Sequence, residues 1–163
     1  MRHTISVLVE NKFGVLSRVS GLFSGRGFNI ESLSVGETID PAISLMTIVT
    51  SGDDRIVEQI TKQLNKLIDI IKVTDFMEID HVEREMVIIK VAPRKNDKAD
   101  FLRIAEIFRG RIVDSGPSTF TVEITGDEKK IAAFIDMVRP FGIKEFVRTG
   151  KVAMAREGFR KPQ

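Results

Sequence analysis

The residues best suited to bind a small ligand lie within the first 30 positions, where Asn11 and Gly14 stand in a short connection. Gly14 precedes residues with a helical pattern, so the amide N–H groups after it lack intrahelical partners and lie at the positive end of the helix dipole. Such amides suit a carboxylate. Asn11 adds a carbonyl acceptor and two amide donors, which can address the ammonium and carboxylate of a free amino acid. Asn29 offers the same groups further along the chain. The competing interpretation is that these are ordinary turn and strand-start residues.

The elements that position these residues follow from hydrophobic periodicity. Residues 5–10 are rich in β-branched side chains and predict a strand, and a second strand begins at Phe28-Asn29-Ile30. Gly25 and Gly27 are expected to end the helix between the two strands. The apolar residues of that helix recur on one face, namely Val15, Leu16, Val19, Leu22 and Phe23.

The remaining sequence predicts the same order of elements twice. In the first half, a strand at residues 43–50, a helix starting near Asp53 and a strand at residues 70–76 complete a βαββαβ pattern. The second half repeats this order, with predicted strands at residues 85–91, 112–114, 119–125 and 143–149. The predicted fold class is therefore α+β, with two tandem ferredoxin-like domains at residues 1–80 and 81–163.

The repeat fails where the ligand-binding chemistry lies. The first half has Glu10-Asn11-Lys12-Phe13-Gly14 after its first strand, whereas the second half has Val91-Ala92-Pro93-Arg94-Lys95. Nothing in the second half repeats Phe28-Asn29-Ile30-Glu31 either. We therefore expect a small-molecule site in the first half and none in the second.

Composition excludes several classes of protein. The chain has no cysteine, so disulfides and thiolate metal sites are excluded. Its net charge is +2 and most of its charges are interspersed in sign, which argues against a nucleic-acid-binding surface. The basic stretches at residues 94–98 and 151–161 are interpreted as a solvated loop and a solvated terminus. We see no targeting segment and no apolar run that could span a membrane, so a cytoplasmic location is expected.

Catalytic and RNA-binding interpretations are weaker. A histidine-based site would need His3 or His81, and no nucleophile motif accompanies either residue. Glu10 and Glu31 could form a carboxylate pair, although glutamates on strands are usually solvated. Arg26-Gly27-Phe28 matches the start of an RNA-recognition motif, but the next residues do not continue it and the motif lies on the wrong strand.

Each half would bury only roughly 60% of its unfolded surface alone and exposes sheet edges, so we expect a homodimer.

Two runs near the N-terminus resemble a known family. Val-Leu-Val-Glu-Asn-Lys-Phe-Gly-Val-Leu-Ser-Arg-Val at residues 7–19 and Gly-Leu-Phe-Ser-Gly-Arg-Gly-Phe-Asn-Ile-Glu-Ser-Leu at residues 21–33 closely resemble small regulatory subunits of acetolactate (acetohydroxyacid) synthase. Residues 81–85 and 148–153 are similar to that family's domain junction and C-terminal segment. The resemblance implies an N-terminal ACT domain followed by an ACT-like domain.

The resemblance also implies a function. The chain would be non-catalytic and hold no cofactor, while a separate large catalytic subunit would carry thiamine diphosphate, Mg²⁺ and FAD. The small subunit would raise the activity of that partner and make it sensitive to valine. In the family, effectors bind at the ACT dimer interface, between the first loop of one chain and the second strand of the other. The matching positions are Asn11, Gly14, Val15, Leu16, Asn29 and Ile30. The alternative is a stand-alone ACT-type amino-acid sensor that controls another partner.

Overall fold

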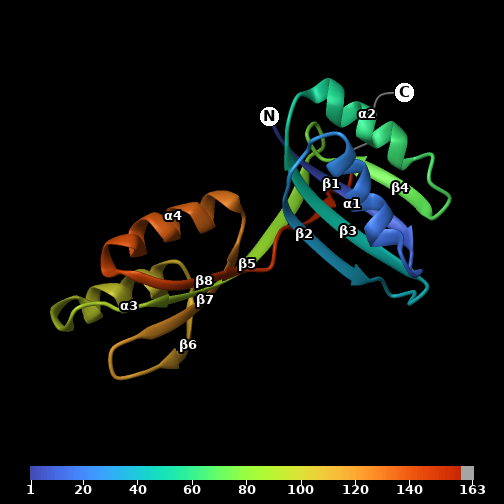
Figure 1. Ribbon diagram of the computed structural model, residues 1–163. Coiled ribbons are helices and arrows are strands. Elements are labelled where there is room, and N and C mark those ends of the chain that lie inside the picture. Colours follow the sequence, from blue (N-terminus) through green and yellow to red (C-terminus); the bar gives the residue numbers. More distant parts are fainter. Residues whose placement is uncertain (159–163) are drawn as a thin grey trace. The chain divides into compact units, whose positions relative to one another are not determined.

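The computed structural model describes residues 1–158, which form two compact units (Figure 1). The first unit consists of Met1–Val82 together with the segment that begins at Lys151, and the second consists of Glu83–Gly150. The predicted division placed every residue after position 80 in the second domain. The structure differs from it because the last described stretch of the chain returns to the first unit.

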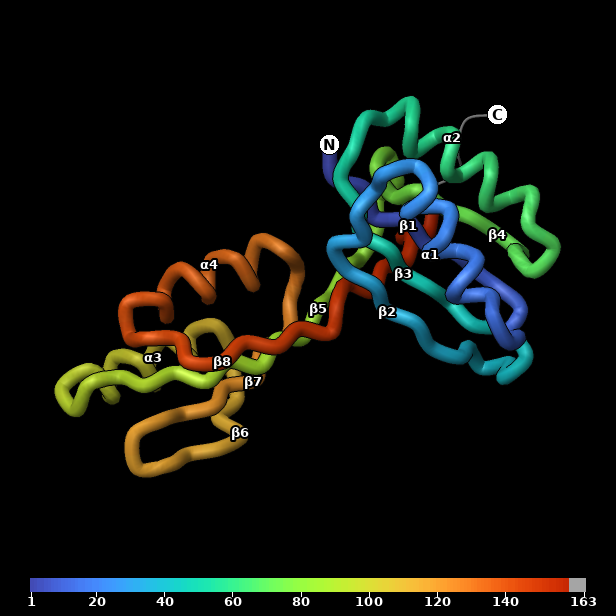
Figure 2. Tube along the Cα trace, in the orientation of Figure 1, coloured from blue at the N-terminus to red at the C-terminus, as the bar shows by residue number. Residues whose placement is uncertain are grey.

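The first unit is a four-stranded antiparallel sheet with two helices, and Figure 2 traces its path from the N-terminus. Strand β1 pairs with β3 and β4, and β3 pairs with β2, which gives the order β2-β3-β1-β4. Since β1 and β2 both run antiparallel to β3, they run parallel to each other. The elements are β1 (Arg2–Glu10), α1 (Val15–Gly25), β2 (Ile30–Glu37), β3 (Ile43–Ser51), α2 (Asp54–Leu64) and β4 (Ile70–Asp75).

The core of the first unit lies between the sheet and its helices. Alternate side chains of β1 point toward the helices because successive strand residues face opposite sides. Residues of α1 and α2 spaced three or four apart meet them. The buried members are Ile5, Val7 and Val9 of β1, Val15, Val19 and Phe23 of α1, and Val57, Ile60 and Leu64 of α2. Leu16, predicted on the apolar face of α1, is instead 44% exposed.

The second unit repeats this design. Strand β5 pairs antiparallel with β7 and β8, and the order is β6-β7-β5-β8. The two tandem βαββαβ units that the sequence predicts are thereby confirmed. The elements are β5 (His81–Val91), η1 (Lys95–Asp97), α3 (Lys98–Ile107), β6 (Arg111–Ser115), β7 (Phe120–Gly126), α4 (Glu128–Val138), η2 (Arg139–Phe141) and β8 (Ile143–Arg148). The last strand, β9 (Val152–Ala155), belongs to the first unit.

Strand β9 lies in the stretch that was predicted to be a solvated terminus. Lys151 and Ala153 are buried, and β9 pairs with β5. The backbone N–H of Lys151 also donates to Ser32 Oγ in β2 at 3.3 Å. Residues 159–161 of the basic stretch lie outside the described residues. Among residues 1–158, no helix has both the length and the apolar character needed to cross a bilayer.

Candidate functional site

The connection between β1 and α1 has the features that an anion-binding helix start requires. Gly14 is the N-cap residue of α1 and adopts φ +82°, a left-handed conformation that side-chain-bearing residues rarely take. No side chain caps this helix, and its first turn carries no acidic residue. The first amides of α1 are therefore not covered by a capping side chain and carry the positive end of the helix dipole.

Asn11 is held in place just before this helix start. Its Nδ2 group donates to Glu37 Oε1 at 3.2 Å and to the carbonyl oxygen of Pro41 at 2.9 Å. Because these bonds use both amide donors, the group that Asn11 retains for a ligand is its carbonyl oxygen. That oxygen is an acceptor and suits an ammonium group. The sequence predicted that the side chain of Asn11 could contact both the ammonium and the carboxylate of a ligand. In the structure only its carbonyl oxygen is left for this, so only the ammonium contact remains.

The remaining predicted residues of the α1 start differ in accessibility. The side chain of Val15 is 3% exposed and belongs to the core, and its backbone N–H donates to the carbonyl oxygen of Lys12 at 3.4 Å. Leu16 is substantially exposed on α1. Lys12, between Asn11 and the helix, is paired with Glu10 at 2.8 Å. The hydrogen bond and charge of Glu10 raise the pKa of Lys12, which keeps the lysine cationic.

Asn29 and Ile30 occupy the start of β2. The side chain of Asn29 is exposed, and the backbone carbonyl oxygen of this residue accepts a 2.7 Å hydrogen bond from Thr50 Oγ1. Ile30 is half-buried and packs against the first core. In this environment Asn29 can offer its amide to a ligand while Ile30 presents part of an apolar wall.

The two groups of predicted residues lie at opposite ends of the sheet. Ile30 pairs with Thr50, and Thr50 pairs with His3 at the beginning of β1. Asn11 follows the far end of β1, about 26 Å from His3 along an extended strand. The structure therefore does not bring Asn11 and Asn29 together within one chain. A site that uses both needs a second copy.

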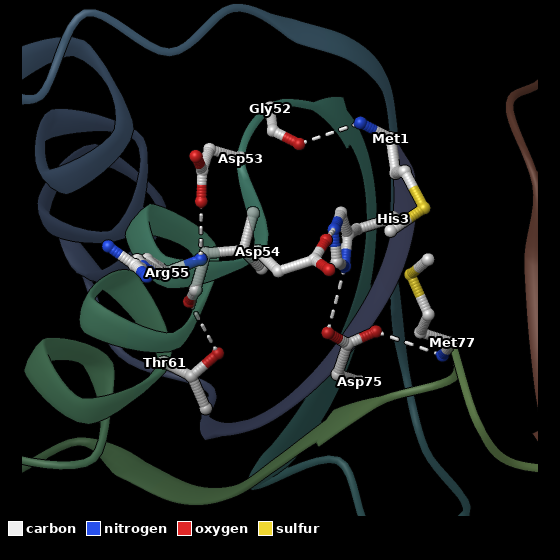
Figure 3. Close-up of polar contacts among 10 residues, drawn as sticks. Met1, His3, Gly52, Asp53, Asp54, Arg55, Thr61, Asp75 and Met77 are labelled. Atoms are coloured by element: carbon white, nitrogen blue, oxygen red, sulfur yellow. Dashed lines mark hydrogen bonds and ion pairs between the residues drawn. The ribbon is translucent and has the colours of Figure 1, made fainter.

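A polar cluster is centred on the buried side chain of His3, as Figure 3 shows. His3 is 3% exposed, with Nδ1 2.9 Å from Asp75 Oδ2 and Nε2 3.0 Å from Asp54 Oδ1. The cluster joins β1, α2 and β4 beside Thr50. Sequence reasoning missed it because its two carboxylates are 51 and 72 residues from His3.

The structure also places the residues of the weaker alternatives. Glu10 pairs with Lys12 at one end of the sheet, while Glu31 lies near the other end with its Oε2 2.9 Å from Arg2 Nε. They do not form a carboxylate pair. Phe28, the aromatic residue of the RNA-type match, is partly buried against the core and does not present a free ring for base stacking.

Comparison with known proteins shows which family this chain resembles. A family model described as "AHAS small subunit-like ACT domain" matches residues 5–72, and one described as "Small subunit of acetolactate synthase" matches residues 84–157. The acetolactate synthase small subunit of Aquifex aeolicus is 55% identical over 96% of this chain and 82% of that protein. This chain belongs to the acetolactate synthase small-subunit family. The first unit is accordingly an ACT domain of the small-subunit type.

Other members of the small-subunit family agree along nearly the full chain. The small subunit of Escherichia coli acetolactate synthase isozyme 3 is 46% identical over 96% of this chain and 96% of that protein. The crystal structure of the Thermotoga maritima small subunit is 43% identical, covers 98% of this chain and 99% of that chain, and superposes with a TM-score of 0.86. Membership implies a catalytic large subunit as partner, consistent with a regulatory rather than a catalytic role.

Proposed function

We propose that this chain, as the small subunit of acetolactate synthase, binds valine between two ACT domains and conveys feedback inhibition to the large catalytic subunit. It also enhances the activity of that subunit. The observation that carries the proposal is the separation of Asn11 and Gly14 from Asn29 and Ile30 at opposite ends of one sheet, because this arrangement suits a site shared by two copies.

A two-fold dimer through β2 joins the separated groups. Strand β2 is an edge strand that runs from Ile30 to Glu37, and Asn11 is hydrogen-bonded to Glu37. When two β2 edges pair antiparallel about a two-fold axis, Glu37 of one copy approaches Ile30 of the other. Asn11 and Gly14 of one copy then come near Asn29 of its partner. Each dimer acquires two equivalent sites.

The chemistry of such a site fits a branched-chain amino acid. The ligand carboxylate accepts hydrogen bonds from the backbone N–H groups that follow Val15 in the first turn of α1, which no side chain caps. The ammonium group donates to the carbonyl oxygen of Asn11, and the amide of Asn29 from the second copy completes the polar contacts. Ile30 and Leu16 provide apolar surface for the side chain of valine.

Regulation follows if valine favours one arrangement of the paired ACT domains. A coupling free energy of about 1–3 kcal/mol corresponds to inhibition of roughly 5- to 150-fold. The chemistry of condensation belongs to the large subunit, with thiamine diphosphate, Mg²⁺ and FAD as its cofactors, and this chain holds none of them. Family membership favours that partner over the alternative of a stand-alone sensor. The whole complex works in the cytoplasm, in the synthesis of valine and isoleucine.

The proposal is tested by binding and by complementation between subunits. Valine at 100 times its dissociation constant should stabilise the protein by about 2.7 kcal/mol, measured by thermal unfolding. Asn11→Leu and Asn29→Leu should each abolish the shift, whereas Asn96→Leu, at an exposed asparagine in the second unit, should retain it. Mixing the first two variants should restore binding, because each mixed dimer contains one site with both asparagines intact. No restoration in a mixture shown to contain heterodimers would contradict a shared site.

Inhibition gives an independent readout. Gly14→Asp places a carboxylate at the helix start and repels the ligand carboxylate. With the reconstituted large subunit, this variant should still enhance acetolactate formation but should no longer confer valine inhibition. Full inhibition by valine in this variant would remove Gly14 from the site.

A further inference from the structure

Three apolar side chains of the first unit stand apart from all others in their exposure. Phe13, Ile39 and Ile68 expose 102%, 105% and 95% of their reference surfaces. Every other large hydrophobic side chain among residues 1–158 exposes 73% or less. We call these three residues the apolar tips. Single exposed hydrophobic residues are normal on protein surfaces, but a group of fully exposed ones indicates an interaction site.

The apolar tips lie on three separate loops at one end of the sheet, the right-hand end of this unit in Figure 1. Phe13 follows β1, Ile39 lies between β2 and β3, and Ile68 precedes β4. Backbone hydrogen bonds connect these loops to one another at the end of β1. The N–H of Glu10 donates to Asp69 at 2.8 Å, and the N–H of Asn11 donates to Ala42 at 2.7 Å.

Two of the tips are presented by well-bonded turns. Around Ile39, Thr38 Oγ1 donates to the carbonyl oxygen of Asp40 at 2.9 Å, and Asp40 Oδ1 accepts from the N–H of Ala42 at 3.0 Å. Around Ile68, the N–H of Ile70 donates to Leu67 at 3.3 Å. Turns already held in this way lose little conformational entropy when their side chains are buried by a partner.

The charged residues at this end of the sheet do not favour a partner with a strongly positive or strongly negative surface. Lys12 pairs with Glu10, and Arg18 pairs with Asp69. Because these charges are matched within the chain, the surface around the tips is neither a basic patch for a nucleic acid nor an acidic one for a polycation. It fits an apolar protein surface with a polar rim, as in specific protein interfaces.

We propose that the apolar tips dock the chain onto the large catalytic subunit. Family membership establishes that a large subunit exists. A second copy paired along the β2 edge cannot cover all three tips, since these span the sheet from β2 to β4, three strand spacings or about 14 Å. A partner that covers all three approaches along the strand axis. Phe13 alone can bury roughly 150–250 Å² of the roughly 800 Å² that one partner usually contributes.

This surface adjoins the proposed effector site. Phe13 lies in the sequence between Asn11 and Gly14, so a ligand held by those two residues also restrains the loop that carries Phe13. The coupling from ligand to large subunit rests on the proposed function, whereas docking through the tips does not. A valine-bound loop would present Phe13 differently to the large subunit, which supplies a short route for inhibition.

The test uses the intact chain and the purified large subunit of acetolactate synthase from the same organism. Phe13→Ser, Ile39→Ser and Ile68→Ser should each weaken binding at least about 10-fold, and the triple variant at least about 100-fold. Ile107→Ser and Met154→Ser, at 69% and 73% exposure elsewhere, are controls that should remain within about twofold. Fully exposed positions tolerate serine, so circular dichroism and thermal unfolding should show folded variants.

Several outcomes would overturn the docking proposal. Unchanged affinity of the triple variant for the large subunit would do so, as would a change in oligomeric state with that affinity intact, because the tips would then join copies of this chain. An equal loss of binding in the two controls would also contradict it. The valine-dependent thermal shift of the triple variant, measured without the large subunit, separates the proposals. Absence of that shift in the wild type would end the effector proposal and leave docking standing.

Discussion

The two units differ most in the connection between their first strand and first helix. In the first unit, residues 11–14 turn through a left-handed Gly14, and the first turn of α1 carries no acidic residue. In the second, Pro93 is buried and the 3-10 turn Lys95–Asp97 leads into α3, whose N-cap residue has an ordinary φ of −101°. The units share a fold and a core pattern. The effector site that we propose thus depends on a few connecting residues, and the core pattern that both units share does not determine it.

The second helices of the two units are nearly equivalent at their starts. Asp53 Oδ1 accepts from the N–H of Arg55 at 2.8 Å in α2, and Asp127 Oδ1 accepts from the N–H of Lys130 at 2.8 Å in α4. Both follow a glycine. These caps stabilise their helices in both units. They are therefore a control for the connection between the first strand and the first helix, which differs between the units.

The largest expected difference concerns Gly14. Gly14→Ala forces a side-chain-bearing residue into φ +82° and places its Cβ 3.2 Å from Arg18 Nη1. The free energy of unfolding should fall by about 1–2 kcal/mol. Gly21→Ala, in the middle of the same helix with open space around the new Cβ, should instead raise it by about 0.5–1 kcal/mol. Urea unfolding measures both, and equal signs would show that Gly14 is not conformationally special.

The two aspartate caps should behave alike. Asp53→Ala and Asp127→Ala each remove one capping hydrogen bond and should each lower the free energy of unfolding by about 1 kcal/mol. Asp53→Asn and Asp127→Asn retain an acceptor and should cost less. Thermal unfolding of the four variants tests this equivalence. A large cost in one unit alone would mean that the repeat differs in its helix starts as well as in its ligand connection.

A smaller effect is expected from a pH-dependent ion pair on α2. A hydrogen bond and the charge of Lys62, 2.9 Å away, lower the pKa of Glu58. Because the pKa of Glu58 is lower in the folded than in the unfolded state, the pair stabilises the fold at pH values above the ordinary pKa of a glutamate. This contribution disappears as the pH falls through the folded pKa. Glu58→Gln should therefore cost a little stability at pH 7 and none at pH 2.

The matched change in the second unit is Asp136→Asn. Its carboxylate lies 3.7 Å from Arg139 Nη2, further than in the α2 pair. This variant should have an even smaller effect at pH 7, because both partners are exposed to solvent. Denaturant titrations at the two pH values give the comparison. A larger effect for Asp136→Asn would reverse the order expected from the two distances.

Much of the fold could be predicted because its signals are local. The β-branched run at residues 5–10, the helix spacing that joins Val15 to Val19 and Phe23, and the glycine-aspartate helix starts specify elements through neighbouring residues. The order of elements in the structure confirmed the two predicted βαββαβ units. Strand β9 escaped prediction because a four-residue strand in a basic stretch has no distinctive period, and its burial depends on distant partners such as Ser32.

Sequence by itself determined the family, the repeated fold and the residue types of the candidate effector site, since motifs, periodicity and capping are properties of contiguous residues. Tertiary structure decided where those residues lie. It placed Asn11 and Asn29 at opposite ends of the sheet, committed the amide of Asn11 to Glu37 and Pro41, and buried His3 between two carboxylates. It also brought three loops together at one end and exposed an apolar side chain on each. Strand pairing and loop contacts join residues far apart in the chain, and no local pattern encodes that proximity.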